Sequence, residues 1–288
     1  MWSDHELSVI RRVYARQILF LAGVSNVELE NAFAIVPREK FLGPPPWKIF
    51  RWGSYVTTPD SEPDRIYADV LVGLIPEKGV NNGQPSGHAI WLNAAQAKSG
   101  EHAVHIGAGS GYYSAILAEL VGPSGRVTAI ECIPELAAAA TRNLGSYTNV
   151  SVRQADGSDF AKADVIYVNA GATRPLDAWL DGLKPGGRLI TPLTTDAAFS
   201  ATTPAAGLQG AVFCITRNGD EFTARVVSAS AFIPGERMRD AESEAALAAA
   251  FKNGRLKEVT RLYRGKEAAA LPNDQCWARA EGWALAYH

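Results

Sequence analysis

The sequence predicts an α/β fold in which helices cover both faces of a parallel sheet. Between residues 102 and 191, short apolar runs alternate with amphipathic stretches, as in chains of strand–helix–strand units. The first apolar run ends in Gly107, Gly109 and Gly111, and an amphipathic stretch follows at once. Of the 288 residues, 47% are apolar, which is enough for a substantial buried core.

Composition and charge narrow the classes of partner. The chain has 28 basic and 30 acidic residues, so we expect neither nucleic acid nor a membrane surface as partner. Cys132, Cys214 and Cys276 are far apart and form no CxxC pair, which argues against a disulfide framework and a zinc site. Without a signal-like start or an apolar run of about 18 residues, we expect a cytoplasmic protein. The sequence does not indicate the oligomeric state.

The N-terminal region is expected to be helical. Residues Glu6–Phe20 carry an apolar stripe at spacings of three and four, formed by Leu7, Ile10, Val13, Tyr14 and Ile18. A second helix is expected to begin at Ser25, with Glu28 completing a capping box, and to end before Pro37. Four prolines in Val36–Trp47 then predict a rigid connection at the surface.

The middle of the chain changes from loops to regular alternation. Arg51–Gly87 is loop-rich, and long ordered loops often line functional sites. A helix is expected over His88–Ala97. The expected strands are His102–Ile106, Val127–Glu131, Val150–Gln154, Val165–Asn169 and Gly187–Thr191. The expected helices between them are Tyr112–Val121, Pro134–Leu144 and Pro175–Leu183.

The C-terminal part starts with a turn-rich stretch, Thr195–Gly210, and a β-hairpin, Val212–Thr216 with Phe222–Ser228, around Asn218-Gly219. A helix over Ala241–Lys252, a strand-like run over Glu258–Tyr263, and two tryptophans, Trp277 and Trp283, follow. Such tryptophans are more often core than binding residues. The chain is therefore divided into an N-terminal helical and loop-rich region (1–97), a domain of alternating strands and helices (98–235) and an extension (236–288).

The glycine turn is the first candidate for a binding site. Glycines accept positive φ and let a ligand approach the main chain closely. The spacing is GxGxG, and Tyr112 stands where the dinucleotide motif GxGxxG requires its last glycine, which disfavours NAD. Glu131 ends the next expected strand, twenty residues after Gly111, where a carboxylate can accept hydrogen bonds from both hydroxyls of a ribose.

Two further strand ends carry small or polar residues. Asp156 and Gly157 follow the third expected strand, and Asn169 ends the fourth. Ligands of open α/β sheets lie beyond the carboxyl ends of neighbouring strands, so these residues are expected on the same edge as the glycine turn. Asp156 is positioned to accept from an exocyclic amine, and Gly157 lets the chain pass a base.

The motifs resemble those of class I S-adenosylmethionine-dependent methyltransferases, and more narrowly the protein-L-isoaspartate O-methyltransferase family. VPREKF at Val36–Phe41 looks like that family's N-terminal signature, and HIGAGSGYYSAILAELVG looks like its first cofactor motif. GRVTAIECIPELA is similar to the second motif, and ADGS and LKPGGRLITP to later ones. The resemblance covers roughly Val36 to Thr191.

The resemblance implies a Rossmann-like fold with a mostly parallel seven-stranded sheet, a C-terminal β-hairpin and a C-terminal extension. It implies S-adenosyl-L-methionine as cofactor, S-adenosyl-L-homocysteine as product, and a protein or peptide acceptor with an isoaspartyl or other carboxylate. The cofactor-binding residues it implies are His105, Gly107, Ala108, Gly109, Gly111, Tyr112, Glu131, Cys132, Asp156, Gly157 and Asn169. On the acceptor side it implies Gln84, Ser86 and His88.

Departures from the family pattern keep other functions open. Asn81–Pro85 stands in place of the family's Thr-Ile-Ser-x-Pro, so Gly83 replaces a serine that helps to hold the acceptor, and Ser86 lies three residues later. His105 stands where the family usually has an acid. The alternatives are a methyltransferase of this fold for a peptide natural product or small molecule, and a non-catalytic cofactor-binding homologue.

Overall fold

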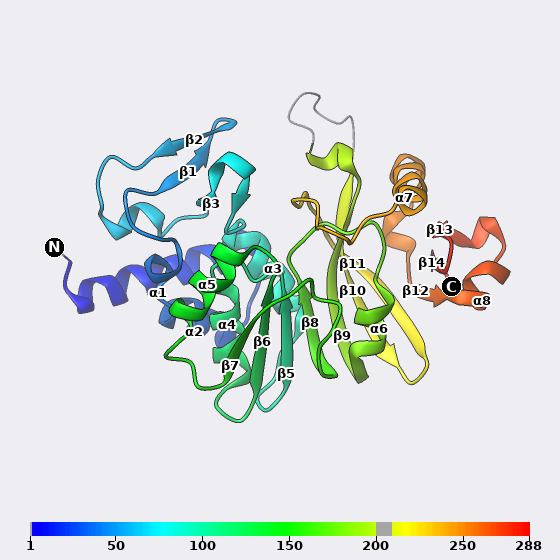
Figure 1. Ribbon diagram of the computed structural model, residues 1–288, viewed down its shortest axis with the longest axis horizontal. Helices are drawn as coiled ribbons and strands as arrows, with labels where there is room; N and C mark the ends of the chain where they lie inside the picture. Colours follow the sequence, from blue (N-terminus) through cyan, green and yellow to red (C-terminus); the bar gives the residue numbers. More distant parts are fainter. Residues whose placement is uncertain (1, 200–208) are drawn as a thin grey trace. The chain divides into compact units, whose positions relative to one another are not determined.

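The computed structural model describes residues 2–199 and 209–288, so most of Thr195–Gly210 lies outside the described residues (Figure 1). Contacts within the chain define two units, Met1–Ala155 and Asp156–His288. The strands and helices follow the alternation that the sequence predicts, with a Rossmann-like α/β arrangement.

The first unit contains a parallel layer of β5 (His102–Ile106), β6 (Arg126–Glu131) and β7 (Val150–Gln154), in that order (Figure 1). In register, His102 faces Arg126, and Val127 faces Val150. α4 (Tyr112–Val121) packs on β5 and β6, and α5 (Pro134–Asn143) packs on β6 and β7. Every residue of β5 is buried, as expected for a strand covered on both faces. The expected bounds of these elements are confirmed to within one residue.

Three helices pack together beside this layer: α1 (Asp4–Ala22), α2 (Val27–Ile35) and α3 (Pro85–Ala95). The expected capping box at Ser25 is wrong. Asn26 caps α2, since its backbone is extended and its Oδ1 accepts from the Leu29 N–H at 2.9 Å. Placing Val13 on the buried face of α1 is also wrong, because it is 49% exposed and the buried stripe runs through Tyr14, Ala15, Ile18 and Leu19.

The Val36–Trp47 connection is not the surface segment that its prolines suggest. A short 3₁₀ turn, η1 (Arg38–Phe41), lies in the core, where Arg38 is fully buried and Phe41 is 1% exposed. Prolines exclude regular hydrogen bonding without deciding burial. In this segment Lys40, Gly43 and the three successive prolines 44–46 are exposed, and the other residues are buried or half-buried. The chain continues through β1 (Lys48–Arg51), β2 (Ser54–Thr57), η2 (Pro63–Ile66), β3 (Gly73–Ile75), η3 (Pro76–Lys78) and β4 (Val80–Asn81).

In the second unit, β8 (Ala163–Val168) pairs in parallel with β9 (Leu183–Thr194). Antiparallel pairing then continues through β10 (Gly210–Asn218), β11 (Glu221–Ala229), β12 (Arg261–Arg264), β14 (Trp283–Ala286) and β13 (Cys276–Ala280). The hairpin around Asn218-Gly219 is confirmed, since Asn218 faces Glu221 and Gly219 has a φ of +66°. The remaining elements are α6 (Asp177–Gly182), η4 (Asp196–Phe199), α7 (Ala241–Asn253), η5 (Leu256–Glu258), α8 (Gly265–Ala270) and η6 (Asn273–Gln275).

The extension after β11 has its own packed core. Trp277 is 5% exposed, packs against Phe251 and Phe213, and donates from Nε1 to the Gly254 carbonyl at 2.9 Å. Trp283 is 1% exposed and donates to Ser243 Oγ at 3.0 Å. The expectation that both are core residues is confirmed.

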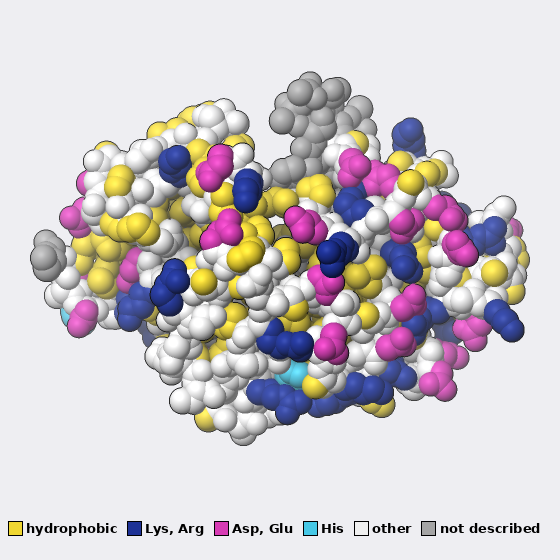
Figure 2. All heavy atoms as spheres, viewed as in Figure 1, with side chains coloured by type: hydrophobic (Ala, Val, Ile, Leu, Met, Phe, Trp, Pro, Cys, Tyr) yellow, Lys and Arg dark blue, Asp and Glu magenta, His cyan; other side chains and the backbone are white. Residues whose placement is uncertain are grey.

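The surface is charged in a mixed way. On the face in Figure 2, basic and acidic side chains are interspersed, in line with a formal net charge of −2. Among the described residues, every helix is too short or too polar to span a bilayer.

Candidate functional site

The glycine turn links β5 to α4 and has the backbone that its sequence predicts. Gly107, Gly109 and Gly111 have φ values of +74°, +57° and +98°, which side chains with a β-carbon rarely adopt. The N–H groups of Gly107 and Ala108 both donate to the Ile130 carbonyl, at 2.9 and 3.0 Å. The turn is therefore tied to the end of β6.

The turn also leaves the start of α4 without a side-chain cap. Gly111 is the N-cap residue, and a β-carbon there would stand 2.8 Å from Leu144 Cδ1. A glycine is thus required by backbone conformation and by packing. The exposed N–H groups and positive dipole end of a helix favour a carboxylate or another anion.

Glu131, at the end of β6, is oriented by the main chain. Its Oε2 accepts from the Gly109 N–H at 2.7 Å, and its Oε1 accepts from the Ile133 N–H at 2.9 Å. The side chain is only 4% exposed, while that of the neighbouring Cys132 is exposed, with Sγ 3.6 Å from Oε1. A carboxylate has about four lone-pair positions, so this one retains capacity to accept from ribose hydroxyls beside the glycine turn. The Glu131 carboxylate fits the ribose hydroxyls of S-adenosylmethionine, and the start of α4 fits the carboxylate of its amino-acid part.

The other residues expected around the cofactor in the first unit are buried. Tyr112 is 2% exposed, and its ring packs edge-on against Phe41 and Phe33, so only its main chain belongs to the glycine turn. His105 is fully buried, with Nδ1 2.8 Å from Ser114 Oγ. Burial lowers the pKa of His105 to about 3, so the residue is neutral where the family usually has an acid.

Asp156, Gly157 and Asn169 belong to the second unit. Asp156 Oδ1 accepts from Ser158 Oγ at 2.6 Å and from the Ser158 N–H at 3.1 Å, and these bonds lower its pKa. Its Oδ2 lies 3.6 Å from the exposed Arg237. The Gly157 carbonyl accepts from Trp179 Nε1 at 3.1 Å, which fixes the chain after Asp156. Asn169 follows β8 and is half-buried.

The expected acceptor residues Gln84 and Ser86 meet on a carboxylate that sequence reasoning missed. Asp69 Oδ2 accepts from Ser86 Oγ at 2.7 Å and from Gln84 Nε2 at 2.8 Å. Asp69 Oδ1 accepts from the Ser86 N–H at 2.8 Å. Ser86 lies in the first turn of α3 rather than in an extended segment, so Asp69 also caps this helix start.

His88 packs beneath the position of the family serine. Its ring stacks on Tyr113 with centroids 3.5 Å apart and planes 5° apart, and it is 1% exposed. A β-carbon on Gly83 would lie only 2.1 Å from His88 Nε2, and Gly83 has a φ of +75°. Burial, and then the Coulombic effects of His105 and Arg38, lower the pKa of His88 well below its usual value. The imidazole is therefore neutral.

Arg38 fixes the loop that carries Asp69. Its guanidinium is fully buried and donates to the carbonyls of Ile66, Ala68 and Val70, the last two at 2.9 and 2.7 Å. Because these carbonyls flank Asp69 on both sides, Arg38 sets its position. The signal for Arg38 was present in the VPREKF motif, whereas nothing around Asp69 distinguished it from other loop acids.

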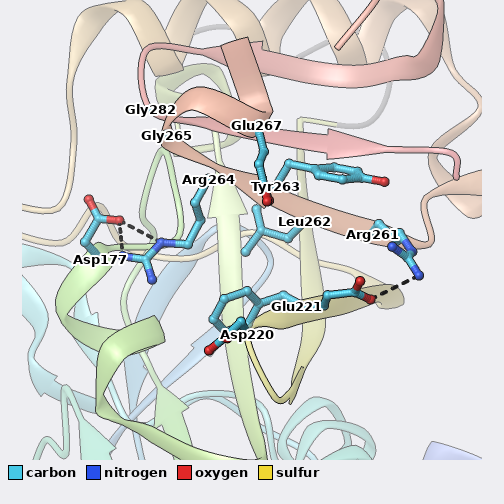
Figure 3. A pocket seen from close by; sticks show the side chains of 11 residues that line it. Asp177, Asp220, Glu221, Arg261, Leu262, Tyr263, Arg264, Gly265, Glu267 and Gly282 are labelled. Atoms are coloured by element: carbon cyan, nitrogen blue, oxygen red, sulfur yellow. Dashed lines mark hydrogen bonds and ion pairs between the residues drawn. The ribbon is translucent and has the colours of Figure 1, made fainter. Parts of the chain in front are cut away.

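A separate cavity of about 480 Å³ lies in the second unit between α6, β11, β12 and α8 (Figure 3). Its basic side chains are paired: Arg264 contacts Asp177 at 2.6 Å, and Arg261 contacts Glu221 at 3.3 Å. None of the residues expected at the site from the sequence lines this cavity.

Comparisons with known proteins identify the family of the chain. The profile of the protein-L-isoaspartate(D-aspartate) O-methyltransferase family matches residues 21–203. The chain is 33% identical over 195 residues to protein-L-isoaspartate O-methyltransferase of Ignicoccus hospitalis, covering 66% of this chain and 84% of the relative. It is 35% identical over 221 residues to protein-L-isoaspartate O-methyltransferase 2 of Marinobacter nauticus, covering 75% and 87%.

Solved structures show the same fold. A protein-L-isoaspartate O-methyltransferase superposes with a TM-score of 0.61 at 22% identity, covering 88% of this chain and 75% of the other. A candidate protein-L-isoaspartate O-methyltransferase from Plasmodium falciparum, in complex with S-adenosyl-L-homocysteine, also gives a TM-score of 0.61, at 18% identity, covering 79% and 98%.

Proposed function

Because this chain belongs to the protein-L-isoaspartate(D-aspartate) O-methyltransferase family, we propose that it methylates a carboxylate with S-adenosyl-L-methionine. The acceptor we propose is the carboxylate of L-isoaspartyl residues in proteins or peptides. The observation that carries the proposal is the Glu131 carboxylate, which the Gly109 and Ile133 amides hold against the glycine turn.

The proposed cofactor residues have separate tasks. Glu131 accepts from the ribose hydroxyls, while the start of α4, next to the glycine turn, receives the carboxylate of the amino-acid part. For the second unit, the sequence pattern supports Asp156 as an acceptor for the adenine amine, with Gly157 and Asn169 as further cofactor-binding residues. The proposal also includes three residues that are adjacent in the chain to Glu131 or to the turn glycines: Cys132, Ala108 and Tyr112.

The proposed reaction depends on positioning of the reacting groups more than on general acid–base catalysis. S-adenosyl-L-methionine supplies a methyl group on a positively charged sulfur, which an ionised carboxylate accepts without a general base. His88 and His105 are neutral and buried, in keeping with a site that moves no proton. Orientation of the reacting groups can account for up to about 7–11 kcal/mol of the barrier. Asp69 contributes by holding Ser86 and Gln84 beside the acceptor.

The experiment is methyl transfer from labelled S-adenosyl-L-methionine to matched isoaspartyl and aspartyl peptides. Base-labile methyl incorporation into the isoaspartyl peptide alone is the expected result. Tight S-adenosyl-L-homocysteine binding without transfer to either peptide would overturn the proposed acceptor. Absence of S-adenosyl-L-homocysteine binding in calorimetry would overturn the cofactor assignment as well.

One observation favours a second candidate acceptor. His88 fills the space of a side chain at position 83, so the family's serine hydroxyl has no counterpart there. A methyltransferase of this fold for a carboxylate of a peptide natural product or small molecule is the alternative. A panel of carboxylate acceptors tested beside the isoaspartyl peptide separates the two.

The cytoplasmic location stays a prediction.

A further inference from the structure

The hairpin of β1 and β2 exposes aromatic side chains to an unusual degree. Trp52, in the turn between the strands, is 92% exposed, and Phe50 and Val56 are 40% and 49% exposed. Tryptophan presents a large apolar surface, and fully exposed indoles are unfavourable unless a partner covers them. The hairpin thus offers a contact surface that the described part of the first unit leaves open.

The turn holds Trp52 in a strained backbone conformation. Trp52 has a φ of +55° and Gly53 a φ of +86°, so both central residues are left-handed. Such two-residue hairpin turns favour asparagine followed by glycine, and a bulky side chain at the first position is disfavoured. An outlier of this kind, held where the side chain makes the surface, points to a function for that side chain.

The hairpin is joined to the acceptor segment by main-chain hydrogen bonds. The Phe50 N–H donates to the Leu71 carbonyl at 2.9 Å, and Ile49 forms an isolated antiparallel β-bridge with Val72. The Val72 carbonyl in turn accepts from the Asn82 N–H at 2.9 Å, one residue before Gly83. Figure 1 shows β1, β2 and β3 side by side. A ligand lying over Gly83 therefore has the hairpin at a fixed distance.

Buried side chains stiffen this connection. Ile49 packs with Leu42, Trp47, Ile66 and Val72 in one apolar cluster beneath the hairpin. Trp47 also donates from its main-chain N–H to Thr58 Oγ1 at 3.0 Å, which closes the base of the hairpin. These contacts hold the base of the Lys48–Thr57 hairpin, called the arm below, against the cluster.

The charge of the arm selects the kind of partner. Lys48 and Arg51 are exposed on β1, and no acid occurs from Leu42 to Pro59. The next acid, Asp60, is paired with Arg65 at 3.0 Å. An arm with exposed aromatics and unopposed positive charge complements an extended acidic polypeptide with apolar residues.

We propose that the Lys48–Thr57 hairpin docks the polypeptide that carries the methyl acceptor, and that it favours acceptors with acidic and apolar residues several positions away from the methylated one. Trp52 and Phe50 contact apolar side chains of that polypeptide, and Lys48 and Arg51 contact its carboxylates. This inference rests on the proposed function, because it assumes a peptide acceptor over Gly83.

The geometry sets the length of acceptor that reaches the arm. Ile49 and Asn82 pair with Val72 from opposite sides, so they lie about 10 Å apart across the strands. Trp52 lies three residues beyond Ile49, which is about 10 Å along the direction of β1 and so roughly at right angles to the first distance. The resulting span of about 15 Å corresponds to about five residues of extended chain. Acceptors with two residues on each side of the isoaspartyl group are too short to reach Trp52.

The test compares W52N, F20S and the parent chain on two isoaspartyl peptides. One peptide has two residues on each side, and the other has eight, with acidic and aromatic residues. Asparagine relieves the turn, so W52N is expected to fold with an unchanged or higher Tm. Phe20 is 84% exposed on α1 and serves as the matched control for loss of an exposed aromatic.

We expect W52N to lower kcat/KM about tenfold for the long peptide through a higher KM, with the short peptide unaffected, and F20S to change neither. We expect K48E/R51E to weaken binding of the long acidic peptide further and to abolish the salt dependence of that binding. Equal kinetics of W52N and the parent on the long peptide would overturn the inference. So would a loss confined to binding of anionic phospholipid vesicles, which would make the arm a membrane contact.

Failure of the proposed function is distinguishable from failure of the arm. If the parent methylates neither peptide, the proposed acceptor is wrong. Fluorescence anisotropy of the labelled long peptide, with aspartate in place of isoaspartate, then measures docking without turnover. Tighter binding to the parent than to W52N supports the arm, and equal binding excludes it.

Discussion

The Nε2 atom of His88 lies 2.1 Å from the position that a β-carbon on Gly83 would take, so the imidazole excludes a side chain there. The imidazole is held there by its stacking on Tyr113, and Gly83 has a left-handed backbone. The absence of the family's serine at position 83 is therefore built into the packing of α3. An acceptor over Gly83 meets main chain rather than a hydroxyl.

Replacing Gly83 with serine is expected to destabilise the protein. The left-handed φ and the overlap with His88 together lower the free energy of unfolding by about 2–4 kcal/mol. Urea denaturation measures this change.

The double variant G83S/H88A is the matched control, because it removes the ring that the serine meets. It is expected to be more stable than the sum of the two single changes indicates. Additive effects in this cycle would show that the two side chains do not share the volume.

Removing the Asp69 carboxylate is expected to impair the acceptor side alone. D69A loses the hydrogen bonds from Ser86 and Gln84, and bonds to a charged group contribute about 1.5–3 kcal/mol. We expect kcat/KM for the isoaspartyl peptide to fall about 10–100-fold, with S-adenosyl-L-homocysteine affinity retained. S86A, which keeps the Gln84 bond, should show a smaller fall. A parallel loss of cofactor affinity in D69A would mean that Asp69 acts through folding.

Removing the Glu131 carboxylate is expected to weaken cofactor binding. E131A leaves the Gly109 and Ile133 amides without their acceptor and removes the proposed ribose contacts. Calorimetry with S-adenosyl-L-homocysteine should show affinity lowered at least tenfold. Glu135, an exposed acid on α5, provides the control E135A, for which affinity should stay unchanged. Equal affinities of E131A and the parent would reject the ribose role.

Arg38 is expected to be essential to the fold of the acceptor loop. R38M leaves the carbonyls of Ile66, Ala68 and Val70 without their donor, and each buried acceptor left unsatisfied costs about 1–3 kcal/mol. R38K, with a single ammonium in place of a fork of donors, should recover little of this. Thermal unfolding compared with K40M, an exposed site two residues away, tests the prediction.

The buried histidines predict a pH dependence of stability. His105 has a folded pKa of about 3, below the value of about 6.5 in an unfolded chain, and burial likewise lowers the pKa of His88. Between these values the unfolded chain binds more protons, so stability falls as the pH falls from about 6.5 towards 3. Each histidine contributes up to about 1.4 kcal/mol per pH unit in this window.

The variant H105N, which stays neutral at every pH, should reduce the slope of the unfolding free energy below pH 6.5. If H105N and the parent have the same slope, His105 does not stay neutral in the folded protein.

The sequence by itself determined the parallel layer and the cofactor edge of the first unit. Apolar runs of fixed length, the alternating glycines and the acid at the end of β6 are local signals, since a short stretch of chain carries each one. The bounds of β5, α4 and β7 follow from them without change. Side chains at strand ends are positioned by the strand itself, which is why Glu131 was identifiable.

Only the tertiary structure decided the acceptor side. Asp69 meets Ser86 across seventeen residues of chain, and Arg38 reaches Ile66–Val70 across about thirty. Burial of Arg38 in a proline-rich segment contradicts the local sequence pattern. Proline indicates the backbone conformation and a charged side chain indicates a preference for water, but neither indicates which distant residues pack against the segment. The overlap of His88 with Gly83 likewise arises from how α3 packs on Tyr113, and the spacing of the two residues along the chain carries no sign of it.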